Sequence, residues 1–126
     1  MRTPPNILLV DDDHDIRLGT KCRLHSAGYS TLEASSGVEG IELAHSRHPD
    51  AIVMDVRMPS MDGLEALQVL QEDEQTRNIP VVMLSASPKD EQTALEMGAR
   101  YFLRKPYAAD TLLAAMRSVT APSASE

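Results

Sequence analysis

The sequence has a single cysteine, Cys22, and no apolar run long enough to cross a membrane. A lone cysteine cannot form an internal disulfide, so we expect a reducing compartment, with the cytoplasm as the default. A membrane-spanning helix needs about 20 predominantly apolar residues, and no segment approaches that length. Residues 1–6 also lack the architecture of a secretory signal peptide. We therefore expect no association with a membrane.

Positive charge is also scarce. The chain has 12 Lys and Arg against 19 Asp and Glu, which gives a formal net charge of −7. Binding to a phosphate backbone needs a basic patch, so we expect no direct nucleic-acid binding by this chain. Its length of 126 residues and hydrophobic fraction of 42% fit one domain with a real core. We place this domain at residues 1–120, followed by a flexible tail or linker stump at 121–126.

Short apolar runs alternate with amphipathic segments along the chain. Near-continuous apolar runs of this length are typical of parallel strands that are covered on both faces. The alternation repeats five times, and it predicts an α/β fold with a parallel sheet, right-handed crossovers and helices on both faces. The second run is weaker and suits an edge strand. Strands are expected at residues 7–10, 30–34, 51–54, 81–84 and 101–103.

Capping residues mark the expected starts of the helices. Asp13 and Asp62 are predicted to be the N-caps of the first and third helices. Ser36, with a glutamate three residues later, indicates a capping box at the second helix. Ser87 followed by Pro88 predicts an N-cap and first helical position for the fourth helix.

Chemically active side chains follow four of the predicted strands. Asp11 and Asp12 follow the first strand, and Asp55 follows the third. Ser85 follows the fourth strand, and Lys105 follows the fifth. The carboxyl ends of parallel strands lie along one edge of an open sheet, where ligands bind. We therefore expect carboxylates, a hydroxyl and an ammonium group to gather at one place.

This combination of groups favours phosphoryl chemistry. Clustered carboxylates repel one another, so in a shallow cleft they need a cation, or some of them must be protonated. An all-oxygen cluster suits a hard divalent ion such as Mg²⁺, with Mn²⁺ as a substitute. The ion, Lys105 and Ser85 could together stabilise the oxygens of a transferring phosphoryl group. One carboxylate could then act as the nucleophile and form an acyl phosphate.

Four sequence blocks contain these side chains: ILLVDDD at 7–13, VMDVRMPSMDG at 53–63, VVMLSA at 81–86 and LRKP at 103–106. In sequence, order and spacing they resemble the signature blocks of response-regulator receiver domains, the CheY-like superfamily of two-component phosphorelay systems. The resemblance extends to about residue 119. It implies a flavodoxin-like (βα)5 doubly wound fold with a five-stranded parallel sheet in the order 2-1-3-4-5.

The resemblance implies roles for individual residues. Asp55 would accept a phosphoryl group from a phosphohistidine on a sensor histidine kinase or a histidine phosphotransfer protein. Asp12, Asp55 and the backbone carbonyl of Arg57 would bind Mg²⁺, and Asp11 would act mostly through metal-bound water. Lys105 would pair with the phosphoryl group. The peptide bond that follows Lys105 corresponds to one that is usually cis in the family.

The resemblance also implies a conformational switch. Ser85 would move to hydrogen-bond a phosphoryl oxygen, and Phe102 would rotate inward at a position where many family members have tyrosine. Arg57 and Ser87 occupy variable positions that tune the lifetime of the phosphoryl group. The change would reach the face formed by the fourth helix, the fifth strand and the last helix. That face could contact a downstream target, which the sequence does not identify, or support a phosphorylation-dependent homodimer.

Two other classes of function are compatible with this fold. A phosphorylation-independent interaction module would not need the complete set of Asp12, Asp55, Ser85 and Lys105. An aspartyl-phosphate phosphatase would have a second aspartate where this chain has Arg57, and a flavin protein would have a phosphate-binding glycine loop after the first strand. We expect a switch that catalyses its own phosphorylation and dephosphorylation, and not a conventional enzyme.

Overall fold

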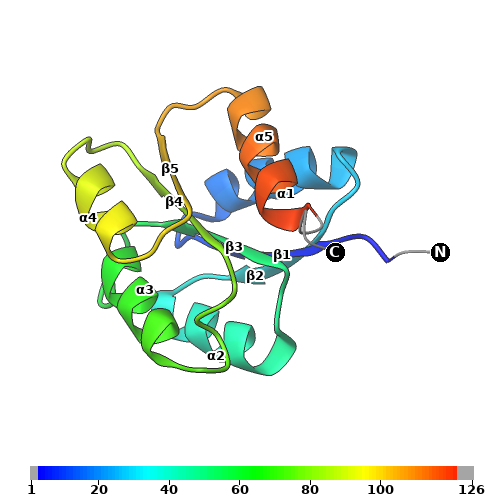
Figure 1. The fold of residues 1–126 in the computed structure, drawn as a ribbon. Coiled ribbons are helices and arrows are strands. Elements are labelled where there is room, and N and C mark those ends of the chain that lie inside the picture. The colour runs from blue at the N-terminus through cyan, green and yellow to red at the C-terminus, as the bar shows by residue number, and fades with distance from the viewer. Residues whose placement is uncertain (1–2, 122–126) are drawn as a thin grey trace.

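Strands and helices alternate five times in the computed structural model, which describes residues 3–121 (Figure 1). The predicted α/β alternation is confirmed. Residues 122–126 of the expected tail lie outside the described residues. The elements are β1 (Asn6–Val10), α1 (His14–Ser26), β2 (Ser30–Ala34), α2 (Gly37–Arg47), β3 (Ala51–Asp55), α3 (Gly63–Glu72), β4 (Val81–Ser85), α4 (Asp90–Glu96), β5 (Tyr101–Arg104) and α5 (Ala109–Thr120).

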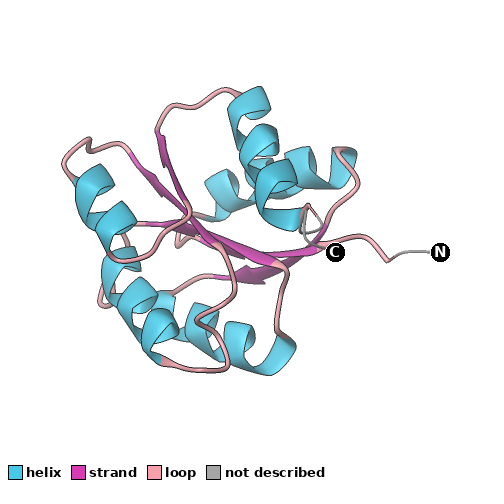
Figure 2. Cartoon of the chain, in the orientation of Figure 1, coloured by secondary structure: helices cyan, strands magenta, loops and turns pink. Residues whose placement is uncertain are grey.

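The five strands form one parallel sheet in the order β2-β1-β3-β4-β5. This is the flavodoxin-like order that the resemblance implies, and β2 lies at an edge as predicted. Helices α1 and α5 cover one face of the sheet, while α2, α3 and α4 cover the other (Figures 1 and 2). The strand order reverses between β1 and β3. In doubly wound folds, ligands bind outside the carboxyl ends of the strands at this reversal.

Strand β1 shows how the sheet divides the core. Ile7 and Leu9 pack with side chains of α1 and α5, while Leu8 and Val10 pack with those of α2, α3 and α4. Successive side chains of a strand point to opposite faces, so a strand covered on both sides is apolar at every position. This explains the continuous apolar runs. None of the described helices is both long and apolar enough to span a bilayer.

The predicted N-caps of the first three helices are present. Asp13 accepts two backbone hydrogen bonds from the first turn of α1, and Asp62 forms a complete capping box with Glu65 at α3. Ser36 accepts a hydrogen bond from the backbone N–H of Glu39 at α2. The carboxylate of Glu39, however, accepts a hydrogen bond from the backbone N–H of Ser35, the residue before the cap, at 2.7 Å. The capping box expected at α2 is therefore not closed.

The predicted start of α4 is wrong. The helix begins at Asp90 with Lys89 at the N-cap position, and no side chain caps it. The Ser87 N–H donates to the Ser85 hydroxyl at 3.0 Å, and Asp90 also contacts that hydroxyl. Residues 86–89 are therefore tied to the end of β4 instead of continuing the helix. A Ser-Pro pair alone does not distinguish these two outcomes.

Candidate functional site

Asp55 is the last residue of β3, and it is only 7% exposed. Its Oδ2 accepts a hydrogen bond from Lys105 Nζ at 2.9 Å, and its Oδ1 accepts one from the backbone N–H of Arg57 at 3.3 Å. A buried carboxylate is costly unless it is paired and hydrogen-bonded. The ammonium group of Lys105, which directly follows β5, supplies the opposite charge.

Gly63 allows α3 to begin directly against the end of β3. Its backbone N–H donates to the carbonyl oxygen of Val56 at 2.8 Å. A Cβ atom at this position would overlap the carbonyl oxygen of Asp55 and would also crowd the end of the Met83 side chain. The close approach of the two segments therefore requires glycine, and it fixes the backbone beside the Asp55 carboxylate.

Three aspartates meet at the carboxyl edge of the sheet. Carboxylate oxygens of Asp11, Asp12 and Asp55 all lie within 4.8 Å of one another. Asp11 is buried and Asp12 is exposed, so the cluster opens to solvent on one side. The Oδ1 of Asp11 accepts the backbone N–H of Asp13 at 2.9 Å, which orients the carboxylate. Lys105 is the cation that contacts Asp55.

The pKa of Asp11 is raised above its ordinary value by burial of its carboxyl group. The hydrogen bond from Asp13 opposes this shift, the charges of Asp55 and Asp12 add to it, and Lys105 opposes it. Three carboxylates and one ammonium group lie at this edge, so their charges do not balance. The side-chain atoms that the cluster offers to a metal ion are all carboxylate oxygens, which hard divalent ions prefer. The residues present therefore fit Mg²⁺.

Ser85 lies at the end of β4 and is fully buried, at 0% exposure. Its backbone carbonyl accepts from the N–H of Lys105 at 2.9 Å, which places it next to that lysine at the same edge. Its hydroxyl donates to Asp90 Oδ2 at 2.7 Å and not to Asp55. The other oxygen of Asp90 accepts from Arg57 Nη2 at 2.9 Å.

The family model for the response regulator receiver domain matches residues 7–117. This chain is a receiver domain of the response-regulator family. The response regulator MprA of Mycobacterium sp. (strain KMS) is 39% identical over 92% of this chain and 50% of its own length. The nitrate/nitrite response regulator protein NarL of Escherichia coli (strain K12) is 41% identical over 94% of the chain and 56% of its own length. The receiver domain thus spans about half the length of these curated relatives.

Solved structures of receiver proteins share the fold. The chemotaxis response regulator CheY4 of Vibrio cholerae has a TM-score of 0.85 and 34% identity, covering 93% of this chain and 99% of its own. The receiver domain of the sensor histidine kinase PA1611 from Pseudomonas aeruginosa PAO1 has a TM-score of 0.87 and 27% identity. It covers 94% of this chain and 99% of its own, and its structure has a magnesium ion coordinated in the active site cleft.

The receiver domain brings most of the predicted site residues together. Asp11, Asp12, Asp55 and Lys105 converge at one edge, as their positions after the strands predict. Ser85 lies at that edge too, but its hydroxyl faces Asp90. The roles assigned to these residues stay predictions.

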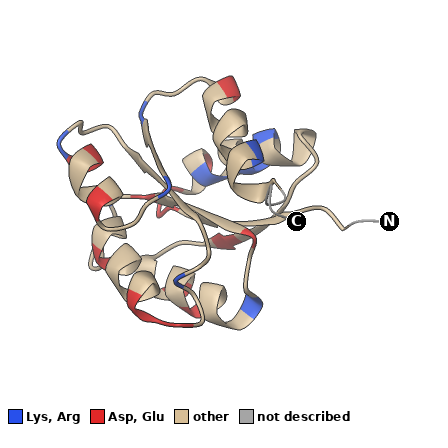
Figure 3. Ribbon diagram, in the orientation of Figure 1, with Lys and Arg blue, Asp and Glu red and all other residues tan. Residues whose placement is uncertain are grey.

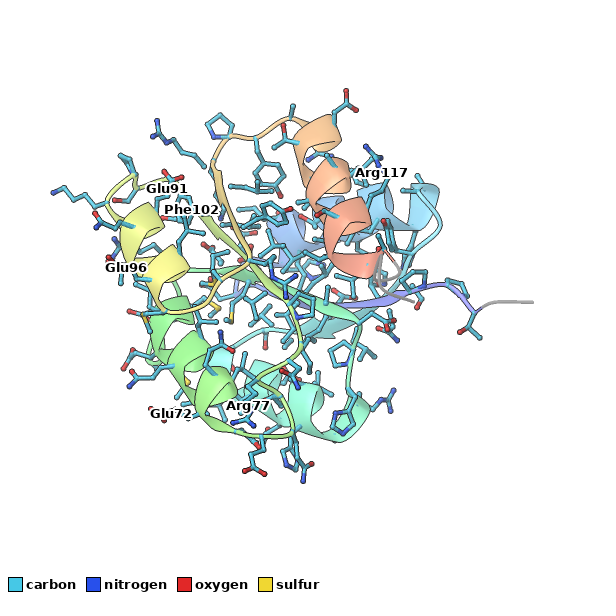
Figure 4. The ribbon with its side chains drawn as sticks, viewed as in Figure 1. Glu72, Arg77, Glu91, Glu96, Phe102 and Arg117 are labelled. Atoms are coloured by element: carbon cyan, nitrogen blue, oxygen red, sulfur yellow. The ribbon has the colours of Figure 1, made fainter. Side chains whose placement is uncertain are left out.

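The remaining predicted residues lie around this cluster. Phe102 is partly buried and packs against the core between the sheet and α2, α3 and α4 (Figure 4). Ser87 contacts Ser85 through its backbone. The peptide bond between Lys105 and Pro106 is cis, as the resemblance implies.

Two residues near the cluster were missed by sequence reasoning. Arg17 of α1 donates to the backbone carbonyl of Asp11 at 2.6 Å and pairs with Glu33 of β2 at 2.9 Å, so it holds the loop that carries the acidic cluster. Asp90 joins the Ser85 hydroxyl to the Arg57 side chain. In the sequence, Asp90 looks like an ordinary acidic residue near a helix start, where such residues are common.

Proposed function

We propose that this receiver domain is a phosphoacceptor switch in a two-component signalling system. Asp55 would accept the phosphoryl group from a phosphohistidine on a sensor histidine kinase or a histidine phosphotransfer protein. The bond from phosphorus to a carboxylate oxygen would form as the bond to the histidine nitrogen breaks. The contact that carries this proposal is the 2.9 Å pair between Lys105 and Asp55, beside two further carboxylates.

The residues around Asp55 have distinct tasks in this proposal. The backbone N–H of Arg57 orients one carboxylate oxygen, and Lys105 would pair with the negative oxygens of the incoming phosphoryl group. Asp12, Asp55 and the backbone carbonyl of Arg57 would hold Mg²⁺, with Asp11 acting mostly through water. When bound, the ion would neutralise charge on the phosphoryl oxygens. The magnesium ion in the PA1611 receiver supports this assignment.

The signal would be an altered surface and not a released product. Ser85 and Phe102 would be the switch residues, and Arg57 and Ser87 would tune the lifetime of the phosphoryl group. The altered face would comprise α4, β5 and α5, and it would contact an unidentified downstream target or a second copy of the chain. We propose that the domain works in the cytoplasm and catalyses only its own phosphorylation and dephosphorylation. Helix α4 of this face carries acidic residues and no basic ones, which supports a protein partner over nucleic acid (Figure 3).

Labelling with radioactive acetyl phosphate tests the phosphoacceptor assignment. We expect the parent protein to be labelled in the presence of Mg²⁺, and we expect EDTA to prevent labelling. Asp55→Asn should not be labelled, because an amide cannot form the acyl phosphate. Asp110→Asn is the matched control, since Asp110 is an exposed aspartate of α5, and it should be labelled like the parent.

Two outcomes would overturn the proposal. Labelling of Asp55→Asn at the level of the parent would exclude Asp55 as the acceptor. A parent protein that responds neither to acetyl phosphate nor to beryllofluoride with Mg²⁺ would be a phosphorylation-independent interaction module instead.

A further inference from the structure

Asp90 is a buried carboxylate that the phosphoacceptor site does not use. It is 7% exposed and is the first residue of α4. It does not belong to the acidic cluster of Asp11, Asp12 and Asp55. Both of its oxygens are nevertheless occupied, one by the Ser85 hydroxyl at 2.7 Å and the other by the Arg57 guanidinium at 2.9 Å. We call this arrangement of Ser85, Asp90 and Arg57 the Asp90 bridge.

The Asp90 bridge determines where the proton of Ser85 points. A hydroxyl group has one proton to donate, and here it goes to Asp90. The Ser85 Oγ also accepts a hydrogen bond from the backbone N–H of Ser87 at 3.0 Å, which fixes the position of the hydroxyl group. Ser85 therefore cannot donate to a phosphoryl oxygen on Asp55 while this bond is intact. A hydrogen bond to a buried carboxylate is also stronger than one between neutral groups.

The Asp90 bridge also connects the two loops that flank the phosphoacceptor. Arg57 lies two residues after Asp55, and its backbone N–H holds the Asp55 carboxylate. Its side chain is 65% exposed and reaches across to Asp90 at the start of α4. Helix α4 has no side-chain N-cap, and the contacts of Asp90 link its first turn to Arg57, just after β3, and to Ser85 at the end of β4.

We propose that Asp90 is a positioning residue that holds the domain in its unphosphorylated state. It would do so by keeping the Ser85 hydroxyl away from Asp55. Phosphorylation of Asp55 would break the bond between Ser85 and Asp90, because the phosphoryl oxygens compete for the same proton. Loss of that bond would free the first turn of α4 and so pass the signal to this helix. This proposal rests on the phosphoacceptor function proposed above.

Titration with beryllofluoride and Mg²⁺, followed by backbone amide NMR signals, tests the role of Asp90. Beryllofluoride serves as the probe of the phosphorylated state. Asp90→Ala should bind it about tenfold more tightly than the parent, because binding no longer has to break a charge-assisted hydrogen bond. Asp90→Asn keeps the size of the side chain with a weaker acceptor, so it should show a smaller gain, and it carries the test if Asp90→Ala does not fold.

A matched control and a double variant separate this role from general effects of charge. Glu91→Ala removes an exposed acid from the same turn of α4 and should bind beryllofluoride like the parent (Figure 4). In a Ser85→Ala background, Asp90→Ala should give no further gain, because there is no hydroxyl to release. A gain that persists without the Ser85 hydroxyl, or the absence of any gain, would overturn the role of Asp90. Failure of the parent to bind beryllofluoride would instead overturn the phosphoacceptor function.

Discussion

Individual buried polar residues mark the functional edge of this receiver domain. Asp11, Asp55, Ser85 and Asp90 are all buried, and each lies at or just after a strand end or at the start of a helix that follows one. Each is hydrogen-bonded, as buried polar groups normally are. Their partners differ, however: the Asp55 carboxylate is paired with the Lys105 ammonium group, whereas the Ser85 hydroxyl donates to the Asp90 carboxylate.

Glu33, near the carboxyl end of β2, is expected to stabilise the fold in a way that depends on pH. Its carboxylate accepts from Arg17 Nε at 2.9 Å and from Lys21 Nζ at 3.1 Å, so β2 is tied to α1. The hydrogen bond from Arg17, then that from Lys21, lowers the pKa of Glu33 below its ordinary value of 4.5. A lowered pKa in the folded state stabilises the protein above pH 4.5, and this contribution is lost as the pH falls through the folded-state pKa.

We therefore expect Glu33→Gln to lower the free energy of unfolding at neutral pH by about 0.5–1 kcal/mol, since the pair is partly exposed. The difference from the parent should shrink as the pH falls below the ordinary pKa of the glutamate. Urea denaturation over a series of pH values measures both effects. Glu74→Gln, at an exposed glutamate, is the control and should change little. A deficit that stays constant down to low pH would contradict the proposed cause.

The sequence predicts part of the site well because strand ends are easy to locate. Asp11 and Asp55 directly follow apolar runs, Asp12 and Lys105 lie one residue further on, and parallel topology brings such positions together. The direction of the Ser85 hydroxyl was not predictable. It depends on Asp90, which reaches Ser85 because the chain turns at residues 86–89. No periodic pattern in the sequence predicts the conformation of that turn.

At the scale of elements, α3 and α4 are attached to the sheet in different ways. Helix α3 begins with a complete capping box and with Gly63 in close contact with the end of β3. Helix α4 has seven residues and no side-chain cap, and Asp90 links it to the neighbouring loops. The start of α4 is therefore linked through Asp90 to Ser85 and Arg57, while the start of α3 is fixed by its own capping box and by Gly63.

Replacing the cap of α3 tests the strength of this attachment. We expect Asp62→Ala to lower the free energy of unfolding by about 1 kcal/mol, because it removes the carboxylate that accepts from the Glu65 backbone N–H. The backbone N–H of residue 62 can still donate to the Glu65 carboxylate. Asp62→Asn keeps a side-chain acceptor for the N–H of residue 65 and should lose less. Urea denaturation gives both values. Equal stability of Asp62→Ala and the parent would show that the Asp62 side chain does not stabilise α3.

The strands were easier to predict than the helix boundaries for a physical reason. In β1, β3 and β4, burial on both faces imposes an apolar residue at nearly every position, so the signal is dense. A helix start depends on one or two side chains, whose partners are set by tertiary contacts. At α3 the local pattern and the tertiary contacts agree. At α4, the contacts of Asp90 and Ser87 with Ser85 override the local Ser87-Pro88 pattern.

At the scale of the whole molecule, the acidic edge should link ion binding to stability. An ion that binds only the folded state stabilises it, by about 2.7 kcal/mol when its concentration is 100 times the dissociation constant. We expect Mg²⁺ to raise the melting temperature of the parent above that in NaCl of equal ionic strength. Asp12→Asn should reduce this gain, because it removes one of the clustered carboxylates. Thermal unfolding followed by circular dichroism measures the shift.

Asp110→Asn, far from the cluster in the sequence, is the control and should keep the full response to Mg²⁺. An equal rise in NaCl and in MgCl2 would show that salt merely screens the negative charge of the chain. The experiment would then argue against a specific ion site at the three aspartates.

The parallel topology also decides where the chain enters and leaves. Strand β1 starts at the amino edge of the sheet, and α5 runs back against the strands to finish near the same edge (Figure 1). A resin, a fluorophore or a fused protein joined at either end would therefore attach near the amino edge of the sheet, opposite the edge that carries the acidic cluster. In protein immobilised through either end, the cluster of Asp11, Asp12 and Asp55 would face the solution. Either end should therefore suit surface-based measurements of the reaction with a phosphodonor.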